Sequence, residues 1–367
     1  MPPFRGRPPY LMSEMIAAEP ALAERLLHRL ATDDALASLG DAVRAATAAG
    51  RPIMVTGCGT SEHAAAGIAA LLTEALELPA GREVVSMQAL ETLRRPLADG
   101  VLIAVSHEGG THVTNAAIRD ARAAGATTAL VTVGSGSPGA ALAEIVIATG
   151  EQDQSWCHTV GYLSPLIAGV ALGAKLRGSR PDAAAIRALL DVSEDARPVA
   201  DVAAALTTVD RLLVVGSGAD HVTARELALK LAEGARLPTT SHELESLLHG
   251  HLAAANRWTG LILVDTDASA GAGPIHERAA RVLAAASALG LAAAGILDEA
   301  RADAIPVGET PAGRIVLPHT GRVPGIAGSL LSSAVALQLL TERLARARGV
   351  NPDTIGREDP AQAAAHA

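Results

Sequence analysis

Short apolar segments alternate with helical segments along most of this chain, and the alternation occurs twice. In the first half the predicted strands are residues 53–56, 101–106, 128–133 and 144–148. After a helical region at 181–206, new predicted strands follow at 211–215, 260–264, 292–296 and 314–317. Strands separated by helices pair in parallel, and the helices cover both faces of the sheet. The sequence therefore predicts an α/β fold of two tandem parallel-sheet αβα sandwich domains.

A repeated turn supports this duplication. The turn at 55–61, Val-Thr-Gly-Cys-Gly-Thr-Ser, corresponds to Val-Val-Gly-Ser-Gly-Ala-Asp at 214–220. Helical periodicity also predicts helices over 10–30, 34–49 and 327–348. We therefore expect an N-terminal helical cap at 1–50, a first domain at 51–195, a second at 196–348 and a tail at 349–367.

Charge and composition narrow the classes of partner. The chain has a net charge of −9 and no dense run of Lys and Arg, which argues against nucleic acid and anionic membranes. We see neither the apolar segment of a secretory signal at the start nor a run of about 18 apolar residues. Cys58 and Cys157 are too few for a disulfide framework. These features predict a cytoplasmic protein that binds a small molecule.

Two loops of the first half have the composition of anion sites. The first is Gly57-Cys58-Gly59-Thr60-Ser61 and the second is Ser106-His107-Glu108-Gly109-Gly110-Thr111, and each lies between a predicted strand and a helix. Backbone amides at a helix N-terminus attract anions. Neither loop has the spacing of a dinucleotide or Walker site, so we expect no NAD, ATP or other cofactor. Tight turns without a ligand are an equally good interpretation of each loop taken singly.

Together with the opening segment at 9–15, the loops resemble those of the SIS (sugar isomerase) domain family. The resemblance covers nearly the whole chain. It is strongest to the isomerase half of glucosamine-6-phosphate synthase and extends to stand-alone amino-sugar-phosphate deaminase/isomerases and fructosamine deglycases. It implies flavodoxin-like, SIS-type domains. No segment resembles the glutaminase domain of the synthase, so glutamine-dependent amidotransfer is not expected.

The resemblance implies a sugar or sugar-phosphate site in these loops. Its residues would be Gly59, Thr60, Ser61, Ser106, His107, Glu108 and Thr111. Glu108 stands where the family has a phosphate-binding serine. A carboxylate in contact with phosphate would repel it by roughly 4 kcal/mol. Either Glu108 points elsewhere, or the ligand presents an amine or hydroxyl there.

A helix in the second half carries the candidate catalytic residues. Glu226, Lys230 and Glu233 share one stripe, a pattern that by itself indicates a solvated face. However, the segment at 227–233 resembles the family helix that carries the isomerase lysine and glutamate. His249 follows Glu233 at the family's spacing for a ring-opening histidine. The resemblance implies that Glu233 moves a proton between C1 and C2, and that His249 comes from the partner subunit of a homodimer.

Other segments give weaker signals. Trp156 replaces a family valine in the sugar pocket, where it would stack on a sugar or serve as a structural anchor. The family's C-terminal lysine, which closes over the sugar, has no counterpart, because no lysine follows Lys230. His242, Glu243, Glu245 and His251 match no compact zinc motif, so no metal is expected.

The sequence leaves two hypotheses for function. The first is an enzyme that isomerises, deaminates or deglycates a sugar or amino-sugar derivative by proton transfer at C1/C2. The second is a non-catalytic sugar sensor that has kept the fold. Glu233 and His249 favour the enzyme, whereas Glu108, Val160 and the absent lysine fit the sensor. Which sugar is bound, whether it is phosphorylated and the reaction direction are left open.

Overall fold

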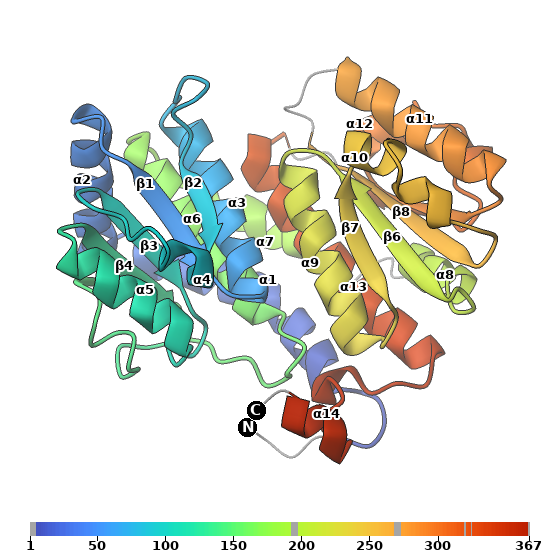
Figure 1. The fold of residues 1–367 in the computed structure, drawn as a ribbon, viewed down its shortest axis with the longest axis horizontal. Helices are drawn as coiled ribbons and strands as arrows, with labels where there is room; N and C mark the ends of the chain where they lie inside the picture. The colour runs from blue at the N-terminus through green and yellow to red at the C-terminus, as the bar shows by residue number, and fades with distance from the viewer. Residues whose placement is uncertain (1–4, 192–196, 268–272, 319–320, 324, 366–367) are drawn as a thin grey trace. The chain divides into compact units, whose positions relative to one another are not determined.

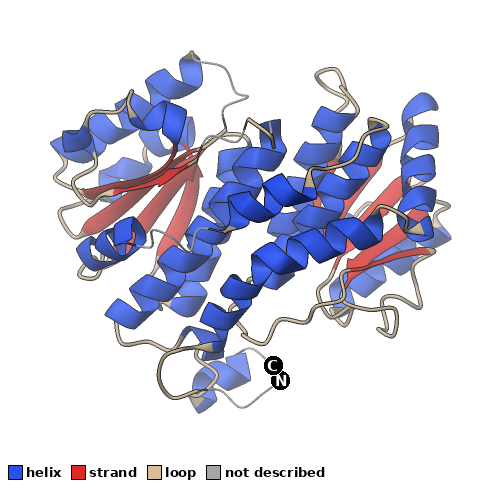
Figure 2. Ribbon diagram, turned by 180° about the vertical axis from the view of Figure 1, so that it is seen from behind, coloured by secondary structure: helices blue, strands red, loops and turns tan. Residues whose placement is uncertain are grey.

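A computed structural model describes residues 5–191, 197–267, 273–318, 321–323 and 325–365 (Figure 1). The described chain contains two five-stranded parallel sheets, each with helices on both faces (Figure 2). The chain divides into two compact units that are not continuous in sequence. The first unit comprises residues 19–152 and 160–188, and the second comprises 1–18, 153–159 and 189–367.

The first unit is built on a sheet of order β2-β1-β3-β4-β5. Its strands are β1 (Ile53–Gly57), β2 (Val85–Gln88), β3 (Val101–Val105), β4 (Thr127–Thr132) and β5 (Ile145–Ala148). The helices are α2 (Asp34–Ala48), α3 (Thr60–Ala75), α4 (Ala89–Thr92), α5 (His112–Ala123), α6 (Val160–Leu176) and α7 (Ala183–Leu190), together with most of α1 (Leu11–Leu30). Every residue of the central strand β3 is buried, which accounts for its continuous apolar sequence.

The second unit repeats this arrangement with the order β10-β9-β8-β6-β7. Its strands are β6 (Arg211–Gly216), β7 (Thr239–Glu243), β8 (Thr259–Asp265), β9 (Ala292–Asp298) and β10 (Arg314–Leu317). Its α-helices are α8 (Arg197–Ala205), α9 (Ala219–Gly234), α10 (Leu244–Leu248), α11 (Pro274–Ala288), α12 (Glu299–Ala302), α13 (Gly325–Ala347) and α14 (Pro360–Ala365). The 3-10 turns are η1 (His251–Ala254), η3 (Val307–Glu309) and η4 (Pro352–Thr354).

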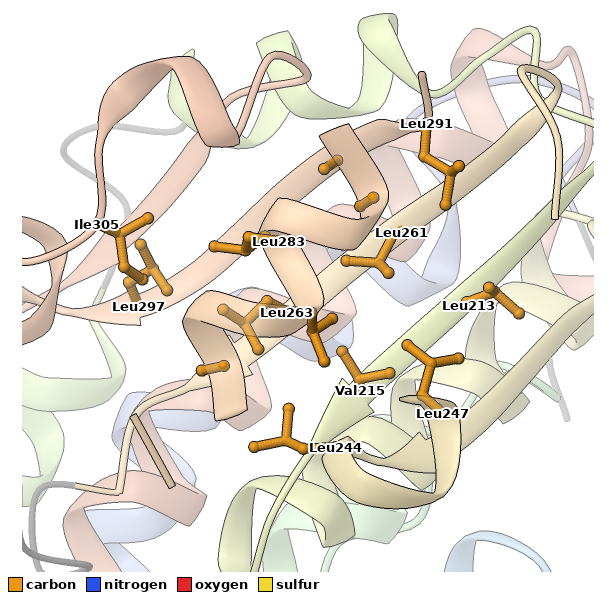
Figure 3. Packing of buried hydrophobic residues seen from close by; sticks show 14 residues of the cluster. Leu213, Val215, Leu244, Leu247, Leu261, Leu263, Leu283, Leu291, Leu297 and Ile305 are labelled. Atoms are coloured by element: carbon orange, nitrogen blue, oxygen red, sulfur yellow. The ribbon is translucent and has the colours of Figure 1, made fainter. Parts of the chain in front are cut away.

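Leucine, valine and alanine fill the core of the second unit. Leu261 and Leu263 of β8 pack with Leu283 of α11 and Leu247 of α10 in one cluster (Figure 3). Helix α13 lies elsewhere in the unit and packs on α8 and α9. It is the one described helix long and apolar enough to cross a membrane, whereas the sequence analysis predicted no apolar run of that length. Its apolar window is 83% buried in the protein, as expected for a core helix.

The predicted fold class is confirmed, and all eight predicted strands occur. Two further strands, β2 and β7, were not predicted, because both are short edge strands that lack a buried apolar run. The compact units also differ from the continuous blocks expected. Residues 1–18 belong to the second unit and the rest of the expected N-terminal cap to the first, while 153–159 belong to the second. One reason is that the backbone amides of Leu11 and Met12 bond to the Asp353 carboxylate (2.8 and 2.9 Å).

Candidate functional site

Both predicted loops of the first unit lie at the carboxyl ends of neighbouring strands. Strand β2 lies on one side of β1 and β3 on the other, so the chain reverses direction across the sheet between β1 and β3. Ligands of open parallel sheets bind at such a switch point. The first loop follows β1, and the second follows β3. The fold therefore places the predicted sugar loops together.

The first loop is held in shape by its glycines. Gly59 precedes α3 with a positive φ of 57°, a conformation that other residues adopt at a cost. A Cβ added to Gly57 would lie 2.5 Å from the carbonyl oxygen of Ser61. Thr60 is buried and Ser61 is half-buried at the start of α3. The hydroxyls and amides of this turn are thus presented at the positive end of a helix.

The second loop brings Ser106 and Thr111 together, with 3.4 Å between their hydroxyl oxygens. Thr111 directly precedes α5 and is exposed. His107 is buried, and its carbonyl oxygen accepts hydrogen bonds from the Thr132 hydroxyl and the Val133 amide (both 2.9 Å). Burial lowers the pKa of His107 to about 4. Its imidazole is therefore neutral at pH 7 and gives this loop no positive charge.

Glu108 is exposed and turned toward the loop after β5. Its Oε1 accepts a hydrogen bond from Nε2 of Gln152 (2.9 Å). Strand β5 lies on the opposite side of β3 from β1, so this contact directs the carboxylate away from Ser61. Of the alternatives raised by the sequence, the geometry favours the one in which Glu108 points elsewhere.

The equivalent loops of the second unit contain an anion of their own. Asp220, the counterpart of Ser61, is buried near the start of α9. Its Oδ2 accepts the amides of Thr266 (2.9 Å) and Asp267 (3.1 Å), which follow β8. Its Oδ1 accepts the hydroxyls of Thr266 and Ser329. A carboxylate thus occupies the switch point of this sheet.

Helix α9 carries the predicted catalytic stripe, and the stripe is not solvated. Lys230 is 1% exposed, and its Nζ lies 2.6 Å from Oε2 of Glu233 and 3.7 Å from Oε1 of Glu226. Glu226 is fully buried, whereas the Glu233 side chain is 24% exposed. Burial lowers the pKa of Lys230, but the two carboxylates raise it by more, and the pKa ends above its usual value. A buried ammonium thus orients a partly accessible carboxylate.

The end of α9 is closely packed around Gly234, the residue after Glu233. A Cβ on Gly234 would lie 2.8 Å from Cγ2 of Thr341 in α13 and 3.2 Å from Sγ of Cys157. Cys157 also approaches the carbonyl oxygen of Lys230 (3.9 Å). Burial raises the pKa of Cys157, so this thiol stays protonated and serves as a small packing group.

Trp156 lies in the same unit as Glu233, and its indole stacks with an arginine. The guanidinium carbon of Arg357 lies 3.5 Å from the ring centroid of Trp156. The Trp156 amide donates to the carbonyl oxygen of Asp353 (3.0 Å). Because these contacts join Trp156 to the C-terminal segment, they favour a structural anchor over a sugar-stacking residue.

His249 lies apart from the buried set on α9. It follows α10 and is 75% exposed, with Nε2 3.0 Å from Oε1 of Glu245. Within the chain, its hydrogen-bonding partner is Glu245. The prediction that it acts on a partner subunit's site stays a prediction.

Sequence reasoning did not assign roles to Glu226 and Asp220. Glu226 had the right helical spacing, but spacing alone does not report burial. Asp220 was visible only as the counterpart of Ser61 in the repeated turn. Within the described ranges, no group of three or more His, Cys, Asp or Glu side chains is arranged to hold a metal ion.

Comparison with known proteins gives consistent matches. The model of the SIS domain matches residues 49–175. The glutamine–fructose-6-phosphate aminotransferase (isomerizing) of Symbiobacterium thermophilum is 29% identical over 95% of this chain. The chain spans 58% of the length of that relative.

Two solved structures share the fold over almost their whole length. The C-terminal domain of glucosamine-fructose-6-phosphate aminotransferase from Francisella tularensis superposes with a TM-score of 0.78 at 18% identity, covering 94% of this chain and 98% of that one. Tagatose-6-phosphate ketose/aldose isomerase from Escherichia coli gives a TM-score of 0.75 at 16% identity, covering 96% and 97%. These similarities confirm the predicted resemblance and the fold.

Proposed function

We propose that this chain, whose residues 49–175 match the SIS domain, is an enzyme of the sugar-phosphate isomerase type. The loops at 57–61 and 106–111 bind the phosphate end of the substrate, and Glu233 transfers a proton between C1 and C2 of the open-chain sugar. The names of the similar proteins, an isomerizing aminotransferase and a ketose/aldose isomerase, support this class.

The observation that carries the proposal is the buried charge set on α9. Removing a lysine and a glutamate from water costs several kcal/mol per ion unless the charges are paired. A helix that needed only solubility would place these groups on its exposed face. Here Lys230 and Glu226 are inside, and only the carboxylate of Glu233 reaches solvent. Such an arrangement is typical of a functional site.

The chemistry follows from this geometry. Lys230 donates a hydrogen bond to Glu233 and fixes its orientation, which a base needs in order to accept a proton from carbon. The same carboxylate returns the proton to the neighbouring carbon, so one group is sufficient for both steps. We assign ring opening to His249, because an imidazole can accept and donate protons near neutral pH.

The phosphate assignment is supported by the direction of Glu108. Its carboxylate is turned to Gln152. The Glu108 carboxylate is therefore not directed at an anion bound by the first loop and Ser106, while Thr111 supplies a second hydroxyl. We further propose a cytoplasmic homodimer in which His249 completes the site of the partner subunit.

The decisive experiment is Glu233→Gln, with activity measured on fructose 6-phosphate, glucosamine 6-phosphate and a set of fructosamines. General-base catalysis accounts for about 100- to 10,000-fold in rate, so we expect kcat to fall by that factor at an unchanged KM. The matched control is Glu74→Gln, which changes the equivalent position of α3. Wild-type protein that binds these sugars without turning any over would identify a sensor instead.

A mixture of two inactive variants tests the role of His249. If its imidazole serves the partner's site, heterodimers of Glu233→Gln and His249→Asn contain one site with both wild-type residues. Random reassociation of a two-fold dimer then restores about a quarter of wild-type activity. Absence of any recovery, with heterodimers demonstrated by mass, would place His249 in the site of its own chain or outside the mechanism.

A further inference from the structure

A cavity in the first unit lies between the ends of α1, α2 and α6. Its volume is about 470 Å³, which is in the range of small-molecule sites. Leu27, Leu30, Leu36 and Ala171 form an apolar floor. The remaining lining includes three basic side chains, which are Arg44, Lys175 and Arg180.

The positive charge at this cavity is not neutralised by the described protein. Arg44 pairs with Asp41 at 2.6 Å. Among the described residues, neither the Lys175 ammonium nor the Arg180 guanidinium has a carboxylate partner. Two cations therefore border an apolar floor.

The end of helix α6 explains only part of this charge. A helix C-terminus carries about half a negative charge, which one nearby cation offsets. The carbonyl oxygen of Lys175 already accepts from the Gly178 amide (3.1 Å), and that of Ala174 accepts from the amide and hydroxyl of Ser179 (2.9 and 3.2 Å). Positive charge remains for a ligand.

The cavity is distinct from the sugar loops. Gly169 of α6 lies against Ile68 of α3, and Gly173 lies against Ala75, so the two helices run in the same direction. Helix α3 starts at the first sugar loop and rises about 1.5 Å per residue, which places its end at Ala75 about 20 Å away. Lys175 lies two residues after Gly173, so the cavity is near the end of α3 that is remote from the first sugar loop.

We propose that this cavity binds a small organic anion with an apolar portion. The apolar portion contacts Leu27, Leu30 and Leu36, and the carboxylate or phosphate group lies between Lys175 and Arg180. Because the cavity is remote from the sugar loops, the ligand is an effector or a second ligand and not the substrate. This inference does not depend on the proposed reaction.

Titration calorimetry on the full chain tests the proposal with three probes. Octanoate carries both features, octanol lacks the charge and inorganic phosphate lacks the apolar portion. We expect octanoate to bind more tightly than either. Charge-assisted hydrogen bonds contribute about 1.5–3 kcal/mol, so the double variant Lys175→Gln/Arg180→Gln should weaken octanoate binding about 10- to 100-fold. Ala171→Leu, which fills part of the floor, should weaken octanoate and octanol alike.

The matched control is Arg177→Gln, an exposed arginine at the same helix end that does not line the cavity. It should leave octanoate affinity unchanged. Three results would overturn the proposal: equal binding of octanoate and octanol, equal loss of affinity in the control, or no binding of any probe to wild-type protein. A second copy of the chain that covers the cavity would also prevent every probe from binding, and light scattering would detect such a dimer.

Discussion

The two units share one fold but use it differently. Both sheets have the same strand order, and α3 and α9 both have 16 residues and both follow a Gly-x-Gly turn. Gly59 and Gly218, which precede the two helices, have almost the same φ, 57° and 58°. Two residues after these glycines, however, the first unit has Ser61 and the second has Asp220.

That difference decides which loop is open to an anion. Asp220 accepts the amides of Thr266 and Asp267, and sheet register makes these residues the counterparts of His107 and Glu108. The second unit therefore shows that this loop geometry binds a carboxylate, while its own carboxylate excludes any other. In the first unit a hydroxyl stands in that place, so this loop carries no carboxylate at the position that Asp220 takes in the second unit.

Helices α3 and α9 also differ, but here the second unit has the additional charged residues. Glu226, Lys230 and Glu233 of α9 align with Gly67, Leu71 and Glu74 of α3. The first unit thus lacks the ammonium and one carboxylate. Glu233 lies 13 residues beyond Asp220, about 20 Å along the helix. In the proposed function the two units therefore have different roles: the first unit contributes the loops at the carboxyl ends of its strands, and the second contributes the C-terminal end of α9.

Replacing Lys230 with leucine, the residue at the equivalent position 71 of α3, should have the largest effect on stability and activity. Lys230→Leu removes the ammonium that lies 3.7 Å from the buried Glu226 and 2.6 Å from Glu233. Breaking a buried charge set in this way costs about 3–5 kcal/mol, which urea unfolding would measure, and we expect activity to be lost. The double variant Glu226→Leu/Lys230→Leu also removes the buried carboxylate of Glu226. It should regain much of the stability but none of the activity; recovered activity would show that Glu233 acts without Lys230.

The carboxylate of Asp220 should make stability depend on pH. The pKa of Asp220 is raised from 3.8 to about 6, because burial and, to a smaller extent, the nearby Asp265 raise it by more than the hydrogen bonds from Thr266 and Asp267 lower it. A raised pKa means that the folded state binds the proton more tightly than the unfolded state. The resulting stabilisation is complete below pH 3.8 and is lost as the pH rises through about 6.

A pKa rise of about two units corresponds to about 3 kcal/mol of unfolding free energy at ~1.4 kcal/mol per unit. Asp220→Asn has the same shape and does not titrate. Its amide oxygen can accept from the two backbone amides, and its NH₂ can donate to the hydroxyls of Thr266 and Ser329. The difference in unfolding free energy between wild type and variant should therefore change by about 2–2.5 kcal/mol between pH 4 and 7. A difference that is constant over this range would mean that Asp220 has an ordinary pKa.

The sequence predicted what apolar runs and helical spacing determine. Strands such as Val101–Val105 are buried on both faces, and their continuous apolar sequence therefore predicts them. Strand β7, Thr239–Glu243, did not, because an edge strand keeps one side free for polar residues. The repeated turn expected at 214–220 ends earlier than predicted, because α9 already starts at Ala219.

The site was predictable in its residues but not in its environment. Spacing alone could not show whether Lys230 faces water, because its burial depends on the packing of residues distant in sequence, such as Cys157 and Thr341. Nor could the role of Asp220 be seen, because its partner Thr266 lies 46 residues away. The direction of Glu108 depends on Gln152, which is 44 residues away.

The smallest expected effect comes from giving the first unit the residue of the second. Ser61→Asp places a carboxylate where the proposed phosphate binds. Screened at the protein surface, the repulsion should raise KM for a sugar phosphate about 30- to 100-fold, or about 2–3 kcal/mol, with a smaller change in kcat. Ser61→Ala, which only removes a hydroxyl, serves as the control and should cost about fivefold. For an unphosphorylated fructosamine the two variants should behave alike. If Ser61→Asp instead kept the wild-type KM for fructose 6-phosphate, the two loops would not be equivalent, and Asp220 would not mark the position of the ligand in the first unit.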